Sequence, residues 1–367
     1  MSKGSGVVIG KKFYPQKSPK DFFINYGCGM KFLNIFQWLR RLKTFYKELR
    51  SLMREKNLLI WRINYLIDEL EQEELKNAVL QQKFLSAGND YILNFENPQT
   101  FNEKIHWLRK NYLSDNPLTD MISDKFQFKS YITEKLGSDY IIPLIGKWEN
   151  PEEIEWSALP QKFVLKSNWG GDGNQVLIVK NKEKLDIPAT IRQLSEWISP
   201  WGNPYCYAFT PIFKNLKPCI IAEEYVEQSN GQLSDYKFMC FNGEPRWILA
   251  CSDRGSNTKY ENHDMNWDLF IPSPNSAVRS YVPRPRNFDR MADIARKLSV
   301  PFPLVRVDFY EVEDKVYLGE MTFTPGGGFN TYYREWDLKL GSWLDLSPLP
   351  NMNIDKNKIY YMKGISK

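Results

Sequence analysis

Apolar side chains recur between residues 30 and 86 with the seven-residue period of a coiled coil. With Ile35 at position a, eleven of the fourteen a and d positions up to Leu80 are apolar, and Lys56 and Asn77 interrupt the a series. No proline occurs in this stretch, which is rich in the good helix formers Leu, Lys, Glu, Arg and Gln. The pattern predicts one long helix and favours a coiled coil with a second copy or a partner protein. The alternative is a helix packed on its own catalytic domain.

The pattern shortens after residue 89, where Pro and Gly begin to separate brief helical and strand-like runs. Helices are expected over 102–110 and 123–136, and strands over 162–167, 175–179, 219–226, 236–241, 246–251, 304–311 and 315–321. Strand pairs with interposed helices indicate the α+β class. The predicted domains are a basic N-terminal arm (1–29), the long helix (30–86), a catalytic domain (90–345) and a C-terminal tail (346–367).

Charge is distributed unevenly along the chain. The formal net charge is +5, but residues 1–60 hold thirteen Lys and Arg against three Asp and Glu, which leaves 36 against 41 in the remainder. A basic arm suits an anionic membrane surface or an acidic polymer, whereas a domain that binds nucleic acid is expected to be basic itself, so nucleic acid is not expected as a partner. Neither a signal peptide nor an apolar run of membrane-spanning length is visible. The sequence predicts a cytoplasmic protein, with peripheral contact at the inner face of the membrane as an open alternative.

A glycine-rich turn lies between two of the predicted strands. The first strand ends in Lys166, and Gly170, Gly171 and Gly173 precede the second strand. Glycines let backbone N–H groups approach phosphate oxygens closely, and a lysine at the strand end adds a positive charge. The segment is not a Walker A loop, because no GKS or GKT is present and a strand follows it. Taken alone, it is either a phosphate-binding loop or a plain turn.

Two carboxylates lie on the predicted strands nearest the C-terminus. Asp308 and Glu320 come close together if these strands pair as an antiparallel hairpin. Magnesium is typically held by one or two carboxylates and by substrate phosphates, and the pair therefore suits a metal bound together with a nucleotide. The alternative is a structural ion pair of Arg306 with Asp308 or with Glu320.

Read in order, these pieces resemble the ATP-grasp superfamily, and in particular its TupA-like branch from bacterial polysaccharide loci. The matching segments are TFNEKI (100–105), SDKF (123–126), FVLK (163–166), EEY (223–225), DYKF (235–238), FNG (241–243), RVD (306–308) and GEMTFTPG (319–326). The resemblance covers about residues 95–345. It implies an ATP-grasp fold, in which two α+β subdomains grip ATP, with ATP and Mg²⁺ as cofactors.

The resemblance also implies site residues. Lys166 and Lys125 would contact the nucleotide phosphates, with Gly170, Gly171 and Gly173 in the loop above them. The adenine would lie along the strand end formed by Glu223, Glu224, Tyr225 and Val226.

Asp308 and Glu320 would hold Mg²⁺, and Arg306 would face the transferring phosphoryl group. Thr322 departs from the pattern of many ATP-grasp ligases, which have asparagine there; its hydroxyl remains a possible metal ligand, and the number of metals stays open. Lys237 would serve the site by binding either phosphate or an acidic acceptor.

No histidine stands in a motif with a thiol or hydroxyl, which disfavours a covalent nucleophile; His106, in a helical pattern, is expected to serve packing. The five cysteines show no CxxC spacing, so neither a disulfide framework nor a zinc site is indicated.

The leading hypothesis is a carboxylate–amine ligase that joins an amino acid or other amine to a uronic acid of a capsule or cell-wall polysaccharide. The alternatives are a sugar phosphotransferase and a non-catalytic ATP-binding scaffold for glycosyltransferases. A loop with Arg279, Arg284, Arg286 and Arg290 either receives the acidic sugar or is a solvated surface loop.

Overall fold

The structure is a computed structural model, and all the residues that it describes belong to one compact unit, Leu58–Lys367. The described residues are 73–114, 116–171, 175–203, 211–227, 233–252, 259–271, 282–331 and 334–349. The predicted N-terminal arm, the long helix before residue 73 and the tail beyond residue 349 lie outside them. Of the long helix, only α2 (Glu73–Ser86) is described, so the coiled coil stays a prediction.

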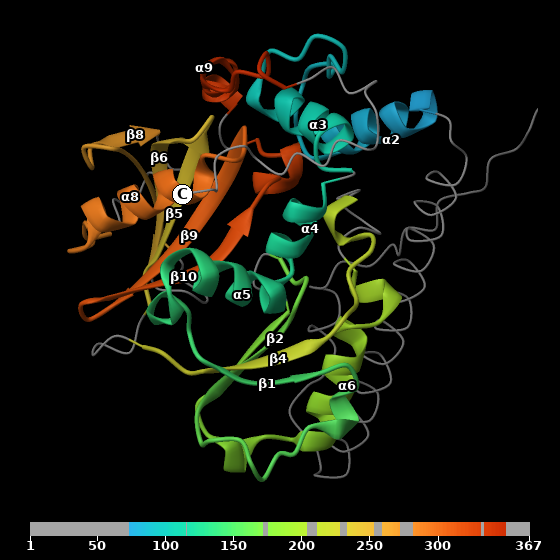
Figure 1. The fold of residues 1–367 in the computed structure, drawn as a ribbon. Coiled ribbons are helices and arrows are strands. Elements are labelled where there is room, and N and C mark those ends of the chain that lie inside the picture. Colours follow the sequence, from blue (N-terminus) through green and yellow to red (C-terminus); the bar gives the residue numbers. More distant parts are fainter. Residues whose placement is uncertain are drawn as a thin grey trace, which may run out of the picture. The chain divides into compact units, whose positions relative to one another are not determined.

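The larger of the two sheets in the described structure has six antiparallel strands (Figure 1). Its order is β10-β9-β5-β6-β7-β8. The strands are β5 (Asp235–Phe241), β6 (Glu244–Ser252), β7 (Lys259–Asp264), β8 (Leu269–Ile271), β9 (Leu304–Val312) and β10 (Lys315–Thr322). Alternate residues of the central strands face opposite sides, because the side-chain period of a strand is two. One side packs on helix α8 (Phe288–Ser299) around Phe238, Val307 and Phe309.

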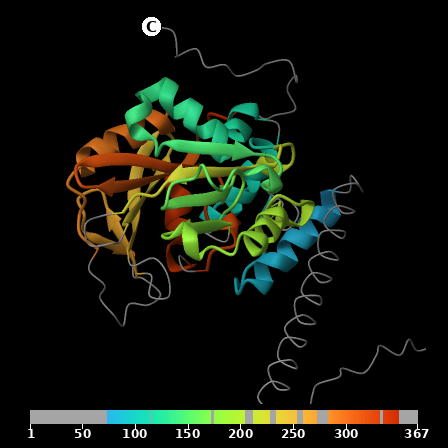
Figure 2. The ribbon, with the colours of Figure 1, turned by 90° about the horizontal axis from the view of Figure 1, so that it is seen from below.

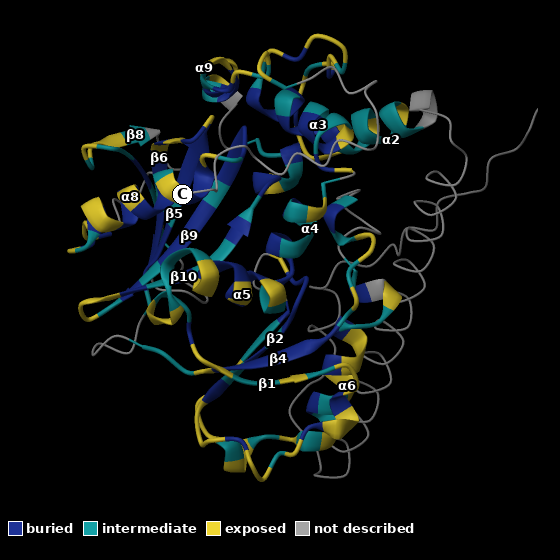
Figure 3. Ribbon diagram, viewed as in Figure 1, coloured by how far each residue is buried: buried dark blue, intermediate teal, exposed yellow. Residues whose placement is uncertain are grey.

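The opposite side of this sheet is apolar at one end and charged at the other. At the apolar end, Met239, Trp247 and Leu304 pack beneath helices α3 (Phe101–Asn111) and α9 (Asp337–Trp343). Further along the same side, β5 and β9 present ionisable residues at positions where Figure 3 shows the strands to be largely buried. Burying charges away from water is costly unless they are paired, so this end of the sheet is a candidate site.

A second, four-stranded sheet has the order β1-β4-β2-β3. Its strands are β1 (Leu144–Trp148), β2 (Phe163–Ser167), β3 (Val176–Val179) and β4 (Ile220–Glu224). Phe163, Leu165, Ile220 and Ala222 form a core with helix α6 (Ile187–Trp197) on one side of this sheet (Figure 2). Lys166 and Glu223 therefore project from the other side.

Helices α4 (Pro117–Ser123) and α5 (Lys125–Leu136) complete the described α-helices, and α5 lies next to both sheets in Figures 1 and 2. Asp124 separates α4 from α5 and caps α5 by accepting hydrogen bonds from the backbone N–H groups of Phe126 and Gln127. The cap makes Lys125 the first residue of α5. Short 3₁₀ segments connect these elements; they are Ser138–Tyr140, Pro151–Glu153, Lys182–Lys184, Pro200–Gly202, Pro211–Phe213, Pro325–Gly328 and Arg334–Trp336.

All seven strands and both helices predicted for residues 90–345 are confirmed, with ends that differ by no more than two residues. The predicted helix 123–136 is divided at Asp124, because Asp124 has the extended backbone of a cap, with φ −75° and ψ 111°. The prediction omitted β1, β7, β8, α4, α6, α8 and α9.

Candidate active site

Helix α5 brings two lysines to the space between the sheets. Lys125 Nζ lies 3.4 Å from Glu320 Oε2 on β10 and donates a hydrogen bond to the carbonyl of Gly170 in the glycine turn. The start of α5 is tied to the same turn, because Lys125 N donates to Asn168 O and Asn168 Nδ2 donates to Asp124 Oδ2. One turn further along α5, Lys129 Nζ lies 2.6 Å from Glu223 Oε1 on β4.

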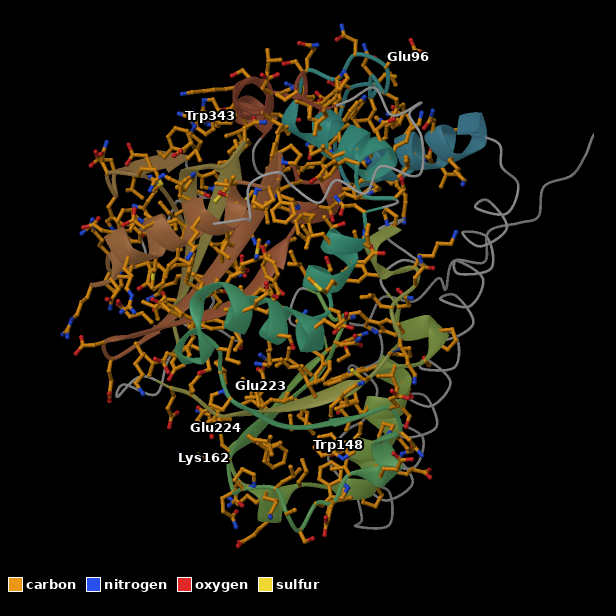
Figure 4. All side chains as sticks on the ribbon, viewed as in Figure 1. Glu96, Trp148, Lys162, Glu223, Glu224 and Trp343 are labelled. Carbon is orange, nitrogen blue, oxygen red and sulfur yellow. The ribbon has the colours of Figure 1, made fainter. Side chains whose placement is uncertain are left out.

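Glu223 carries a buried carboxylate between two lysines. Val164 of β2 pairs with Glu223 of β4, so Lys166, two residues along, projects from the same side of the sheet. Lys166 Nζ lies 2.5 Å from Glu223 Oε2. Burial alone would raise the pKa of Glu223, but Lys166 and Lys129 more than offset it and lower the pKa to about 2. Figure 4 labels Glu223 and its neighbour Glu224 at the end of β4.

The three adjacent strands of the large sheet place one row of charges across the site. Lys237 of β5 pairs with Asp308 of β9, and Asp308 pairs with Glu320 of β10. Lys237 Nζ lies 2.5 Å from Asp308 Oδ2 and also 2.5 Å from Asp235 Oδ2, although the Asp235 residue has no exposed surface. The next row pairs Arg306 with Thr322.

Arg306 bridges the two carboxylates that were predicted to hold metal. Its Nε and Nη2 lie 2.7 Å from Asp308 Oδ1 and Oδ2, and Nη2 also lies 2.7 Å from Glu320 Oε1. Both ion pairs considered from the sequence are thus present in this structure. Thr322 Oγ1 lies 3.5 Å from Glu320 Oε1.

Burial and neighbouring charges act in opposite directions on these groups. For Asp308, burial raises the pKa and outweighs the opposing charges of Arg306 and Lys237, and the charges of Glu320 and Asp235 add to the increase. For Glu320, the charges of Lys125, Arg306 and Lys237 overcome the effect of burial and hold the pKa well below its usual range. For Lys237 and Arg306, the neighbouring carboxylates overcome burial and raise the pKa, so both side chains stay cationic.

The other predicted residues are less closely gathered. Gly170 is buried, and an added Cβ there would lie 2.7 Å from Gln175 Cβ, so the turn requires glycine at that position. Gly171 faces open space, and Gly173 lies outside the described residues. Glu224 is exposed.

Tyr225 and Val226 follow β4 in an irregular segment. The hydroxyl of Tyr225 donates to Glu227 Oε2 at 2.5 Å, and Val226 is half-buried.

Sequence reasoning missed Lys129 and Asp235. Both had a detectable signal, because Lys129 lies one helical turn after Lys125 and Asp235 lies two residues before Lys237 on the same side of a strand. A hollow of about 460 Å³ lies beside the site, and its lining includes Lys129 together with Phe126, Ile141 and Leu144.

The predicted arginine loop is only partly described. Arg284 pairs with Asp289 and Arg286 with Asp314, in both cases through exposed side chains, and Arg290 donates to the hydroxyl of Tyr140. Arg279 lies outside the described residues.

A family model described as TupA-like ATPgrasp matches residues 103–345. The chain belongs to the TupA-like ATP-grasp family. The family and the α+β ATP-grasp fold predicted from the sequence are confirmed, and the predicted enzyme class, an ATP-grasp ligase with ATP and Mg²⁺, agrees with this membership.

Solved structures resemble this TupA-like ATP-grasp chain only distantly. D-alanine–D-alanine ligase from Helicobacter pylori is 15% identical, with 61% of this chain and 62% of that chain covered and a TM-score of 0.32. The Bacillus anthracis ligase complexed with ATP is 14% identical, with 66% and 75% covered and a TM-score of 0.37. N5-carboxyaminoimidazole synthase from Aspergillus clavatus is 16% identical, with 55% of this chain and 44% of that chain covered and a TM-score of 0.32.

The chain thus spans less than two thirds of the length of the Helicobacter pylori enzyme. No curated protein gives a significant match. Within the described residues of this TupA-like ATP-grasp chain, no helix has the length and apolar character needed to cross a bilayer.

Proposed function

We propose that the chain is an ATP- and Mg²⁺-dependent carboxylate–amine ligase that acts through an acyl phosphate. Its acid substrate is a uronic acid of a capsule or cell-wall polysaccharide, and its second substrate is an amino acid or another amine. The observation that supports the ligase chemistry is the set of charged side chains between the two sheets. Lys125, Lys166, Lys237 and Arg306 face Asp308 and Glu320 there.

The residues present fit a magnesium ion that arrives with a nucleotide. Asp308 and Glu320 are direct partners across two strands, where Cβ atoms are about 5 Å apart, so their carboxylates can share one ion. Magnesium binds one or two carboxylates and leaves its other positions to phosphate oxygens and water. Thr322, on the same side of β10 as Glu320, adds a hydroxyl beside it.

The cations of the site suit phosphate groups. In this structure each of them is paired with a carboxylate: Lys166 with Glu223, Lys125 with Glu320, Lys237 with Asp308, and Arg306 with both Asp308 and Glu320. When bound, Mg-ATP supplies the γ-phosphoryl group and a divalent charge for Asp308 and Glu320. Arg306 is then free to donate its parallel N–H groups to the carboxylate or to the transferring phosphoryl group, a geometry that suits guanidinium.

The chain's own residues contribute positioning and charge. Lys166 and Lys125 are held at the glycine turn, where they neutralise phosphate oxygens as charge builds up on them. Lys237, fixed between Asp235 and Asp308, contributes a further positive charge on the side of the large sheet. Such a reaction requires no side-chain nucleophile, because the substrate carboxylate attacks the γ-phosphorus and displaces ADP, and the amine then attacks the acyl carbon and displaces phosphate.

The test is release of phosphate and ADP by the purified full-length chain with Mg-ATP, a panel of uronic acids and their glycans, and amino acids. Each component is omitted in turn. Release that needs both the acid and the amine is expected for the ligase. Release with a sugar alone would instead indicate a phosphotransferase, and ATP binding without release under every condition would contradict both enzymatic functions.

A further inference from the structure

Helix α3 points two polar side chains at a second glycine-rich turn, Gly326–Gly328, which follows β10 and is distinct from the turn at Gly170. His106 and Arg109 lie one helical turn apart and are 2% and 4% exposed. His106 Nε2 lies 2.9 Å from the carbonyl oxygen of Gly328, and Arg109 Nη2 donates to the carbonyl oxygen of Gly327. Arg109 Nη1 also lies 2.9 Å from His106 Nδ1.

These contacts determine the tautomer of His106. A guanidinium group only donates hydrogen bonds, so His106 Nδ1 must accept from Arg109 and the ring proton lies on Nε2. Nε2 then donates to Gly328. Burial and the charge of Arg109 lower the pKa of His106 well below its usual value, which keeps the ring neutral as this arrangement requires. The result is a directed chain of hydrogen bonds from Arg109 through His106 to the turn.

Burial of the Arg109 charge costs free energy that packing alone would not require. Within the described residues it forms no ion pair, and its Nε has no hydrogen-bond partner. Its guanidinium lies 5.6 Å from the ring centre of Phe329, a weaker compensation than a carboxylate. An apolar side chain of similar size would fill the space without burying a charge. The choice of arginine at this position therefore indicates a role in the orientation of the turn.

The turn itself requires outside support and follows shortly after a residue that pairs with Arg306. Gly326, Gly327 and Gly328 have φ of 63°, 64° and 74°, so three successive residues occupy the left-handed region. Glycine is conformationally free there and loses the most entropy when it is ordered. Thr322 pairs with Arg306, and Gly326 follows Thr322 by four residues, so the turn begins at most about 13 Å from Thr322.

We propose that His106 and Arg109 are positioning residues that hold the carbonyl groups of Gly327 and Gly328. They thereby fix the Gly326–Gly328 turn at the Arg306 end of the site. The catalytic consequence rests on the proposed function. The fixed turn keeps the chain that follows β10 in place relative to Arg306. Displacement of a reacting group by about 1 Å is enough to slow a reaction that depends on positioning by about 100-fold.

Two substitutions at His106 separate hydrogen bonding from packing. His106→Phe keeps the ring that packs edge-on against Phe84, Phe95 and Phe329, but it removes both hydrogen bonds. His106→Gln removes the ring but supplies an oxygen that accepts from Arg109 and an N–H that donates to Gly328. If packing were the role, Phe would be tolerated better than Gln; the positioning role predicts the reverse.

The first readout is hydrogen–deuterium exchange of the segment 323–331, which requires neither nucleotide nor turnover. We expect about 10-fold faster exchange in His106→Phe, as for the loss of a hydrogen bond worth about 1.4 kcal/mol, and near wild-type exchange in His106→Gln. Wild-type exchange in the Phe variant, or equal acceleration in both variants, would overturn the proposal. This comparison holds even if the omission assay shows no ligase activity, so the two failures are distinguishable.

The second readout is the division of the kinetic effect in the omission assay. His106→Phe should lower kcat about 10-fold or more with little change in KM for ATP, and His106→Gln should restore most of kcat. Arg109→Met covers the case in which His106→Phe does not fold. It should lower kcat while leaving the melting temperature unchanged or higher, because it removes a buried charge. A lower melting temperature with unchanged kcat would show a purely structural role and overturn the catalytic part.

Discussion

Replacement of Glu223 by Gln tests the electrostatic centre of the small sheet. The residue is 5% exposed, and its carboxylate lies 2.5 Å from Lys166 Nζ and 2.6 Å from Lys129 Nζ. Gln keeps the shape but removes the charge, which leaves two largely buried ammonium groups without their common partner. The lowering of the pKa from 4.5 to about 2 corresponds to roughly 3 kcal/mol of folding free energy at pH 7. The loss of a buried ion-pair partner typically costs about 3 to 5 kcal/mol, which agrees with this value.

The pH dependence gives the sign of the effect. The pKa of Glu223 is lower in the folded chain, so its contribution is complete above pH 4.5 and is lost as the pH falls from 4.5 towards 2. The difference in stability between wild type and Glu223→Gln should therefore shrink by about 1 kcal/mol between pH 7 and pH 3.5.

Urea unfolding at pH 7 and pH 3.5 provides the measurement. Glu244→Gln is the matched control, because the Glu244 side chain is 52% exposed and pairs with Arg296 at the surface. The control should change stability little at either pH. A loss below about 1 kcal/mol at pH 7, or a difference that does not change with pH, would refute the conclusion that Glu223 neutralises the two lysines.

Three further predictions concern the nucleotide and the metal. Lys166→Met should weaken Mg-ATP binding about 10- to 100-fold in calorimetry, which is the value of a charge-assisted hydrogen bond. The control Lys217→Met, at an exposed lysine, should bind Mg-ATP as the wild type does. Equal binding by both variants would contradict a phosphate contact at Lys166. Glu320→Gln should abolish ATP turnover and leave the circular dichroism spectrum unchanged, and persistent turnover would remove the metal assignment. Thr322→Val should raise the Mg²⁺ concentration for half-maximal rate about 3- to 10-fold, and an unchanged Mg²⁺ dependence would exclude its hydroxyl from the metal site.

The central strands were predictable because their apolar residues are dense and clearly bounded. β9 and β10 flank a tight turn at Glu313, and β2 ends at the glycine turn. β7 (Lys259–Asp264) and β8 (Leu269–Ile271) were not predicted, because one is polar along its length and the other has only three residues. α6 was also not predicted, although Pro188, its second residue, suits the first turn of a helix.

The site was predictable where one short segment carries its own chemistry. Lys166 at a strand end and the pair Asp308 and Glu320 on a hairpin fall in this class. The double contact of Glu223 with Lys129 and Lys166 does not, because it depends on the packing of α5 against a sheet formed by distant segments. The same holds for Arg109, whose partner Gly327 lies 218 residues away in the sequence.

The most direct test of the account is to follow oxygen from the acid substrate to the released phosphate. The acid identified by the omission assay is labelled with ¹⁸O in its carboxylate and incubated with the chain, Mg-ATP and the amine, and the phosphate is analysed by mass spectrometry. A carboxylate oxygen that attacks the γ-phosphorus stays on phosphorus when the amine displaces phosphate, so the account predicts one ¹⁸O atom in the phosphate for each amide formed. Amide formation with unlabelled phosphate would contradict an acyl phosphate.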